Sequence, residues 1–302
     1  MKIINKKSKI KIVFILMMSL GLLVACGNKK TDSTVEKEVL MTEEKTEETI
    51  EDATPGVAEA TPEDATPSGA VAENATPQDS EESTTESTEP KTNGKIIVID
   101  PGHSSVVSGN MEPNGPGSSE MKAADSGGTR GVSSGLTEYE LNMIIATQLK
   151  DELVERGYTV ILTREDNVTP ISCAERAAIA NNNNADVFLR LHADGSDNSS
   201  ASGPMGICIT ASNPYISSMY SESRVLSDAI LNSYCAETGM TGRGVWETDT
   251  MTGNNWSQVP TTLLEMGFMT NPNEDLMMAD PAFQVKMVTG IANGIDQYCF
   301  TD

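Results

Sequence analysis

Histidine is scarce in this sequence: His103 and His192 are the only two among 302 residues. This scarcity excludes histidine-rich metal-binding tracts and short chelating patterns with two nearby histidines, such as His-Glu-x-x-His. Each of the two follows a short apolar run typical of a buried strand, KIIVI at residues 95–99 and VFLRL at residues 187–191. Both histidines of the chain therefore lie where predicted strands end.

Basic residues are also few beyond position 30. Residues 31–90 hold 18 acidic residues and two lysines, and residues 91–302 hold 26 acidic and 12 basic residues. The whole chain has a formal net charge of −23. This excess of negative charge disfavours nucleic acids and anionic lipid headgroups as ligands. We therefore expect no nucleic-acid partner, whereas a neutral or cationic polymer fits the charge.

The apolar stretch near the N-terminus, residues 12–25, is too short for a membrane-spanning helix, which needs about 20 residues. Lysines precede it, and the sequence LVAC ends it at residues 23–26. This pattern resembles a bacterial lipoprotein signal, which implies a signal peptide over residues 1–25 and lipidation of Cys26. The protein would then be anchored outside the cytoplasm, facing the cell wall. An ordinary secretory signal or a single-pass anchor remains the alternative.

Residues 26–92 contain few aromatic or branched apolar side chains. They repeat Ala-Thr-Pro, starting at Ala53, Ala60, Ala65 and Ala75, with acidic residues between the repeats. Such a segment cannot bury enough apolar surface to offset the entropy of its chain. We expect a disordered acidic linker, and the tripeptide is a spacer rather than a nucleotide-binding motif.

Hydrophobic periodicity predicts alternating strands and helices in the last part of the chain, residues 93–302. This alternation favours an α/β fold with three layers, in which helices flank a largely parallel sheet in a single catalytic domain. We expect a monomer with a structureless, functional loop at residues 102–136. Strands are expected at residues 95–99, 158–163, 186–191, 206–210, 245–250 and 261–265, and helices at 137–156, 172–180, 218–235 and 281–298.

Four side chains suited to metal chemistry lie where these strands end. In an open α/β sheet, ligands bind at the carboxyl ends of the strands. His103 follows the first predicted strand, His192 follows the third, and Glu265 ends the last. Glu138 lies in the first turn of the helix after the long loop, so it can face the same edge. Two imidazoles and one carboxylate would form a three-ligand Zn²⁺ site with a fourth position open for water, as in catalytic zinc sites.

Spacing alone leaves other interpretations open. His103, Glu138 and His192 are separated by 35 and 54 residues, which matches no short chelating motif. A glutamate at a helix start commonly serves the helix dipole, and Glu140, which completes a capping box, is the alternative ligand. Glu265 ends an apolar run, where an unpaired carboxylate is costly, so it is the candidate general base.

Four segments occur in order along the chain: IVIDPGH at 97–103, GLTEYELN at 135–142, AERAAIANNNNADVFLRLHADG at 174–195 and VPTTLLEMGFMTNPNEDLMM at 259–278. Together they resemble one enzyme family, the zinc-dependent N-acetylmuramoyl-L-alanine amidases of the amidase-3 type. The resemblance covers about residues 95–298. It implies cleavage, by a zinc-activated water, of the amide that joins N-acetylmuramic acid to L-alanine in peptidoglycan.

The resemblance also implies roles for individual residues. The family's motifs place the ligands of a single zinc ion on His103, Glu138 and His192. They place the catalytic glutamate on Glu265. The loop between the first two ligands is longer here than in many relatives, so the substrate subsites are the part that can differ.

Less specific predictions concern the surroundings of the zinc site. Arg130, in the long loop, is a candidate for holding a substrate carboxylate. Asp100, or backbone carbonyls near Asp194, would orient the histidines from behind. Arg190 stands where the family often has a small polar residue, and Asp194 where it often has asparagine.

Two other functions are compatible with the residues alone. A glycosidase could use Glu138 and Glu265 as its paired carboxylates, and a lipoprotein without catalysis could bind wall fragments. Four cysteines in the domain show no Cys-x-x-Cys spacing, so they could form disulfides in three pairings or remain buried thiols. They are Cys173, Cys208, Cys235 and Cys299.

Overall fold

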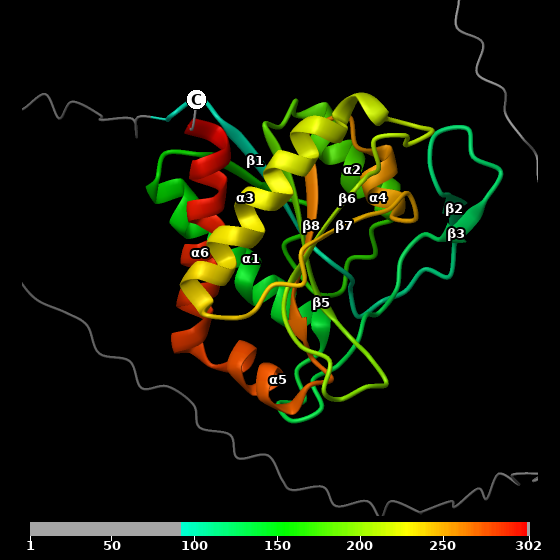
Figure 1. The fold of residues 1–302 in the computed structure, drawn as a ribbon. Helices are drawn as coiled ribbons and strands as arrows, with labels where there is room; N and C mark the ends of the chain where they lie inside the picture. The colour runs from blue at the N-terminus through cyan, green and yellow to red at the C-terminus, as the bar shows by residue number, and fades with distance from the viewer. Residues whose placement is uncertain (1–91, 301–302) are drawn as a thin grey trace, which may run out of the picture. The chain divides into compact units, whose positions relative to one another are not determined.

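A six-stranded sheet forms the centre of the part of the chain that the computed structural model describes, residues 92–300 (Figure 1). Its strand order is β4-β1-β5-β8-β6-β7. The first four of these run parallel, β6 is antiparallel to β8, and β7 is parallel to β6, which confirms the largely parallel sheet. The strands are β1 Ile96–Pro101, β4 Thr159–Leu162, β5 Val187–Asp194, β6 Met205–Cys208, β7 Val245–Glu247 and β8 Thr261–Phe268.

Helices cover both faces of the sheet and give the three layers predicted (Figure 1). On one face α1, α3 and α6 pack over a large apolar cluster, and on the other α2 and α4 cover a smaller one. None of the helices within residues 92–300 combines the length and the apolar character that crossing a membrane requires. The helices are α1 Glu138–Glu155, α2 Cys173–Asn182, α3 Tyr220–Thr238, α4 Thr252–Trp256, α5 Pro272–Ala279 and α6 Pro281–Phe300.

The predictions for the N-terminal part fall on other residues. The signal peptide (residues 1–25), the lipidation site Cys26 and the linker (residues 26–92) lie outside the described residues, apart from the last residue of the linker. They remain predictions from the sequence.

Alternation along β5 sorts its side chains between the two faces of the sheet. Val187, Leu189 and Leu191 belong to the large apolar cluster, whereas Phe188 belongs to the smaller one. Because successive side chains of a strand point to opposite faces, His192 points to the same side as Phe188. Glu265 on β8 is the Cα partner of His192, and opposed residues of neighbouring strands share a face. The sheet register therefore brings these two side chains next to each other.

Both predicted capping boxes are confirmed. At the start of α1, Oε2 of Glu140 accepts hydrogen bonds from the backbone N–H and the hydroxyl of Thr137, at 2.8 and 2.6 Å. At the start of α2, Glu175 accepts from the backbone N–H of Ser172, and the Ser172 hydroxyl accepts from the backbone N–H of Glu175. These reciprocal bonds satisfy N–H groups that have no partner inside a helix, so they fix where each helix begins.

Three elements differ from the prediction. The loop expected to be structureless contains an antiparallel hairpin, β2 (Met111–Pro113) and β3 (Met121–Ala123), whose strands are too short for a hydrophobic period to reveal. Helix α4 is short and apolar periodicity could not identify it. Helix α5 carried a recognisable signal, because the side chain of Asn271 caps it and a proline occupies its first turn.

A buried charge network lies behind the carboxyl end of β1. Asp100 is 0% exposed, and its carboxylate accepts hydrogen bonds from Thr163 (2.6 Å), Arg176 (2.6 Å) and Arg190 (3.0 Å). Burial alone would raise the pKa of Asp100, but the two arginines and the hydroxyl hold that pKa well below its ordinary value. Arg164, also buried, donates to the carbonyl oxygens of Pro101 and Gly102, at 2.8 and 3.0 Å. The network fixes the backbone that leads into the His103 loop.

Replacing Asp100 with asparagine should lower the free energy of unfolding by about 3–5 kcal/mol, because Arg176 and Arg190 would lose their buried counter-charge. Urea unfolding at pH 7 measures this, and Asp151→Asn on the exposed side of α1 is the matched control. Because folding lowers the pKa of Asp100, its contribution is complete above its ordinary pKa of 3.8 and is lost as pH falls further. The difference between wild type and variant should shrink in that range. Equal stability of the two variants at pH 7 would contradict the role of the network.

Candidate metal centre and active site

His103 lies in the loop after β1 and has an unusual backbone conformation, with φ at +65°. Residues with a Cβ seldom occupy this left-handed region, and they remain there where their surroundings hold them. Nδ1 of its ring faces the carbonyl oxygen and the hydroxyl of Ser126, at 3.0 and 2.9 Å. The preceding residue must be glycine, because a Cβ on Gly102 would lie 2.3 Å from Cε1 of His192. The loop therefore turns Nε2 of His103 toward His192.

Glu138, the first residue of α1, is 4% exposed. Its Oε2 accepts a hydrogen bond from the backbone N–H of Thr129 at 2.9 Å, and its Oε1 accepts one from Ala193 at 3.1 Å. The carboxylate is thus fixed between the long loop and β5. Gly128 packs against it so closely that a Cβ there would lie 2.6 Å from Oε2.

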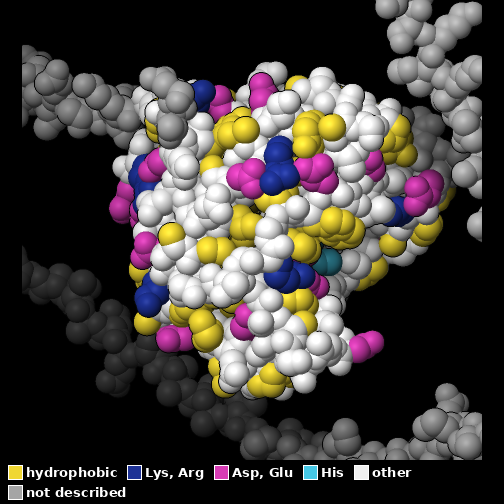
Figure 2. Space-filling view, viewed as in Figure 1, with side chains coloured by type: hydrophobic (Ala, Val, Ile, Leu, Met, Phe, Trp, Pro, Cys, Tyr) yellow, Lys and Arg dark blue, Asp and Glu magenta, His cyan; other side chains and the backbone are white. Residues whose placement is uncertain are grey.

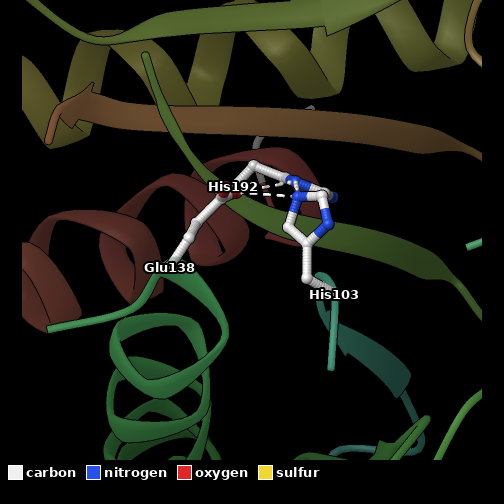
Figure 3. A group of neighbouring side chains, drawn as sticks. All are labelled: His103, Glu138 and His192. Atoms are coloured by element: carbon white, nitrogen blue, oxygen red, sulfur yellow. Dashed lines mark hydrogen bonds and ion pairs between the residues drawn. The ribbon is translucent and has the colours of Figure 1, made fainter. Parts of the chain in front are cut away.

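Three potential ligand atoms meet at the carboxyl edge of the sheet (Figure 3). Nε2 of His103 lies 3.0 Å from Oε1 of Glu138, and Nδ1 of His192 lies 3.1 Å from that oxygen. The two nitrogens are 3.0 Å apart, and the imidazole rings meet edge to face. Figure 3 shows the side chains converging from the top of a helix, from a strand and from the loop beyond another strand.

This triangle fits a metal ion. A tetrahedral Zn²⁺ about 2.0–2.1 Å from each ligand atom requires those atoms to lie about 3.4 Å apart. The observed separations of 3.0 to 3.1 Å need to widen by only a few tenths of an ångström. Within residues 92–300, this is the one group of three or more histidine, cysteine or acidic side chains with ligand atoms all within 4.8 Å.

The protonation states of the buried members suit ligation. Burial alone would raise the pKa of Glu138, but its hydrogen bonds with His103 and His192 hold that pKa well below its ordinary value. Burial lowers the pKa of His192 to about 4, although its bond to Glu138 opposes this shift. A carboxylate and a neutral imidazole are the forms that bind metals, so no proton has to be displaced from either near neutral pH.

Glu265 lies next to this group on β8. Its side chain is half-buried, and Oε2 has neither solvent contact nor a hydrogen-bond partner among the described residues. Burial raises the pKa of Glu265 well above its ordinary value, and the nearby charges of Glu138 and Asp194 act in the same direction. It is not one of the three clustered ligand residues. A carboxylate with a raised pKa at the edge of the candidate metal site is a candidate general base.

A small cavity of about 90 Å³ opens beside the two histidines. Its walls include the buried guanidinium groups of Arg176 and Arg190 and the thiol-bearing Cys173. Figure 2 shows a histidine reaching the molecular surface on one face beside a basic side chain. The candidate metal site is therefore accessible from outside, which a catalytic site requires and a purely structural site does not.

The structure assigns Asp100 and Asp194 contacts other than those predicted. Asp100 binds arginines rather than either histidine, and reaches His103 only indirectly, since Arg176 Nη2 donates to the His103 carbonyl oxygen at 3.2 Å. Asp194 accepts a hydrogen bond from Arg243 at 2.8 Å. The backbone carbonyl that binds a histidine ring is that of Ser126, not one near Asp194, because the long loop folds back over His103.

The remaining predicted residues are also located. Arg130 is exposed, and its Nη1 donates to the carbonyl oxygen of Gly135 at 2.8 Å, so its role toward substrate stays a prediction. Glu140 caps α1 and is not among the clustered ligand residues, which leaves Glu138 as the acid of the site. The four cysteines of the domain are all free thiols.

Sequence reasoning missed the groups that position the ligands. They are Ser126, which binds His103, and the backbone amides of Thr129 and Ala193, which bind Glu138. No pattern marks a backbone amide in a sequence, and one serine in a serine-rich loop gives no signal. The buried ion pair of Arg190 with Asp100 was equally hidden.

Known proteins resemble this chain in sequence. The family described as N-acetylmuramoyl-L-alanine amidase matches residues 97–297. The uncharacterized protein YqiI of Bacillus subtilis (strain 168) is 30% identical over 207 residues, which cover 68% of this chain and 85% of YqiI. The N-acetylmuramoyl-L-alanine amidase LytC of the same organism is 28% identical over 207 residues, which cover 68% of this chain and 36% of LytC.

Solved structures resemble it in fold. The N-acetylmuramyl-L-alanine amidase Ami1 from Mycobacterium abscessus superposes with a TM-score of 0.62 at 26% identity, covering 68% of this chain and 98% of Ami1. An N-acetylmuramoyl-L-alanine amidase from Clostridium difficile 630 gives a TM-score of 0.57 at 25% identity, covering 70% of this chain and all of that one. From its sequence, its fold and the site at its sheet edge, this chain belongs to the N-acetylmuramoyl-L-alanine amidase family and is a peptidoglycan amidase.

Proposed function

We propose that this amidase works with one zinc ion held by His103, Glu138 and His192, and with Glu265 as its general base and acid. The observation that supports this most is the meeting of three ligand atoms within 3.0 to 3.1 Å of one another. Two imidazoles and a carboxylate, with access from a cavity, are the ligand set of catalytic zinc sites.

When bound in such a site, zinc lowers the pKa of a water molecule toward about 7 and polarises a carbonyl group. The chain's own residues prepare that site. Ser126 orients the ring of His103, and the amides of Thr129 and Ala193 orient the carboxylate of Glu138. These contacts hold the ligand atoms in place before the metal arrives.

Glu265 would carry the proton transfers. Its raised pKa makes its carboxylate a stronger base than an exposed glutamate, so it can accept a proton from the attacking water. It would then return that proton to the nitrogen of L-alanine as the amide bond breaks. The position opposite His192 in the sheet supports this role, because both side chains face the same edge.

The two alternative functions have less support. A glycosidase would need the carboxylates of both Glu138 and Glu265 free to face a sugar, but the Glu138 oxygens already contact both histidines and the backbone amides of Thr129 and Ala193. A wall-binding protein without catalysis would be expected to lack one of the four chemical residues, and all four are present. The family match also belongs to amidases.

The anchor and the cellular location are part of the proposal. The substrate lies in the cell wall, so the enzyme acts outside the cytoplasm, and a lipid on Cys26 would attach it to the cell membrane. The acidic linker would then let the domain reach peptidoglycan at some distance from the bilayer. We propose that the enzyme acts as a monomer, because a single chain supplies all three proposed metal ligands.

Metal content provides the first test. Glu138→Gln and His192→Ala should each reduce bound zinc from about one ion per chain to a small fraction of that, because each removes one of three ligands. Glu140→Gln is the matched control, since glutamine also completes a capping box and this residue is not one of the clustered ligands. Atomic absorption on purified protein measures the content. If the Glu138 variant kept its zinc and the Glu140 variant lost it, Glu140 rather than Glu138 would be the metal ligand.

Turnover without metal loss is the second test. Glu265→Gln should lower kcat on purified peptidoglycan by about 10²–10⁴-fold, because it removes the proton acceptor, while zinc content stays near one per chain. The release of L-alanine amino groups is measured, and exposed Glu237→Gln on α3 serves as the control. Near-normal activity of the Glu265 variant would refute its role, and release of reducing ends instead of amino groups would indicate a glycosidase.

Lipidation is the third test. In a bacterial host fed an alkyne-bearing fatty acid, wild-type protein should carry the label and sediment with membranes. Cys26→Ala should lose the label and leave the membrane fraction, because no other residue is proposed as the acylated one. Cys235→Ala, in the folded domain, should behave like wild type. Equal labelling of the Cys26 variant would show that the anchor lies elsewhere.

A further inference from the structure

Trp246 presents an aromatic side chain that is not part of the core. It lies in β7, the edge strand of the sheet, and is 45% exposed. Among residues 92–300, neither of the two apolar clusters includes it. The chain has one other tryptophan, Trp256, which packs against the smaller cluster and donates its indole N–H to the carbonyl oxygen of Pro113 at 2.9 Å. Packing therefore explains Trp256, whereas Trp246 leaves apolar surface in water that burial would stabilise.

The neighbours of Trp246 determine the face of the sheet on which it lies. Val245 packs against the large apolar cluster, and Glu247 accepts a hydrogen bond from an arginine of α3 at 2.6 Å. Both side chains therefore point to the face that α1, α3 and α6 cover. Successive side chains of a strand point to opposite faces, so Trp246 points to the other face. That face also carries His192 and Glu265.

Strand pairing gives the same placement. Ile207 of β6 pairs with Trp246 of β7 and with Leu263 of β8. Leu263 lies two residues before Glu265 on the same strand, so both point to one face. Since paired residues share a face, Trp246 and Glu265 do also. Two strand spacings and two residues separate them, which places their Cα atoms about 12 Å apart.

Open surface connects Glu265 with Trp246. His192, Glu265 and Met205 are paired in one row across β5, β8 and β6, and all three are half-buried rather than covered. Strand β7 follows β6 in the sheet. Figure 2 shows hydrophobic side chains gathered near β7, next to the histidine that reaches the surface. A polymer whose amide lies at the metal site can therefore extend across these strands to Trp246.

The indole of Trp246 fits a sugar ring better than a charged peptide. One face of a sugar ring presents C–H groups, which pack favourably on the negative face of an aromatic ring, while the hydroxyl groups at its rim stay in water. A glycan whose muramic acids carry peptides through amide bonds is itself uncharged. The stem peptide carries carboxylates, which the strongly acidic chain repels.

We infer that Trp246 is a stacking platform for the glycan strand, where it binds a sugar next to the muramic acid whose amide is cleaved. This inference rests on the proposed amidase function. It assigns the edge of the sheet a task in specificity, because the platform favours muramic acid within a glycan strand over a single muramoyl peptide.

The test compares two soluble substrates with the zinc-loaded full-length chain. One is an N-acetylmuramoyl tripeptide, and the other carries the same peptide on an internal muramic acid of a tetrasaccharide. Wild type should cleave the tetrasaccharide with a kcat/KM about tenfold higher, as expected for one added stacking contact. Equal kcat/KM values would overturn the inference while leaving the amidase function intact.

Variants assign the preference to Trp246. Trp246→Ala should reduce the ratio of the two kcat/KM values toward one, because alanine removes the stacking surface, and Trp246→Phe should keep part of the preference. Phe300→Ala, an exposed aromatic residue on α6 and thus on the other side of the sheet, should keep the wild-type ratio. An unchanged ratio in Trp246→Ala would overturn the inference. An equal loss on both substrates would place the contact on the muramoyl peptide and overturn the assignment to a neighbouring sugar.

Tryptophan fluorescence supplies a measurement that needs no turnover. In Trp256→Phe, Trp246 is the one remaining indole of the chain. A neutral oligomer of N-acetylglucosamine should shift its emission, whereas the free stem peptide should not, because only the sugar covers the indole. If this variant does not fold, the difference between wild type and Trp246→Phe gives the same signal.

Two results separate failure of the platform from failure of the proposed function. A shift with the peptide and none with the sugar oligomer would overturn the inference, whatever the activity. If neither substrate nor purified wall released alanine amino groups, the proposed function itself would fail, and the fluorescence shift would still report whether Trp246 binds sugar.

Discussion

The carboxylate of Glu138 is the contact on which the active site depends. It touches His103, His192, the long loop and β5 at once, through two imidazole contacts and two backbone amides. A buried carboxylate is costly without donors, and here every donor comes from a segment that the site must hold in place. The hydrogen bonds that offset the desolvation cost of the buried Glu138 carboxylate therefore also assemble the candidate metal site.

A second set of charges supports this arrangement from behind. Asp100 joins β1 to α2 and β5 through two buried arginines, and Arg164 binds the backbone just before His103. The region behind the site is therefore rich in positive charge, although the chain as a whole is strongly acidic. Buried guanidinium groups next to the cleft are well placed to oppose the accumulated negative charge of Glu138 and Glu265.

The long loop after β1 links the candidate metal site to helix α2. It supplies His103 and the Ser126 contact that orients it, and its hairpin carries Glu112, which accepts a hydrogen bond from the backbone N–H of Ala174 at the start of α2. Insertions in surface loops are tolerated readily and commonly carry function. In this amidase the sheet register sets the positions of His192 and Glu265, and the loop adds His103 to them.

Patterns in the sequence predicted the fold class and the two capping boxes, which the structure confirms, and proposed the four residues of the candidate site. Hydrophobic periodicity, cap signals and ordered motifs are local properties that neighbouring residues encode. The folded chain was needed to show that Glu138, not Glu140, turns inward, that Asp100 binds arginines, and that a hairpin, α4 and α5 complete the fold. The contacts at Glu138 and Asp100 join segments from 9 to 90 positions apart and use backbone amides or buried charges. No local pattern encodes such pairings, because they depend on which surfaces the packed sheet brings together.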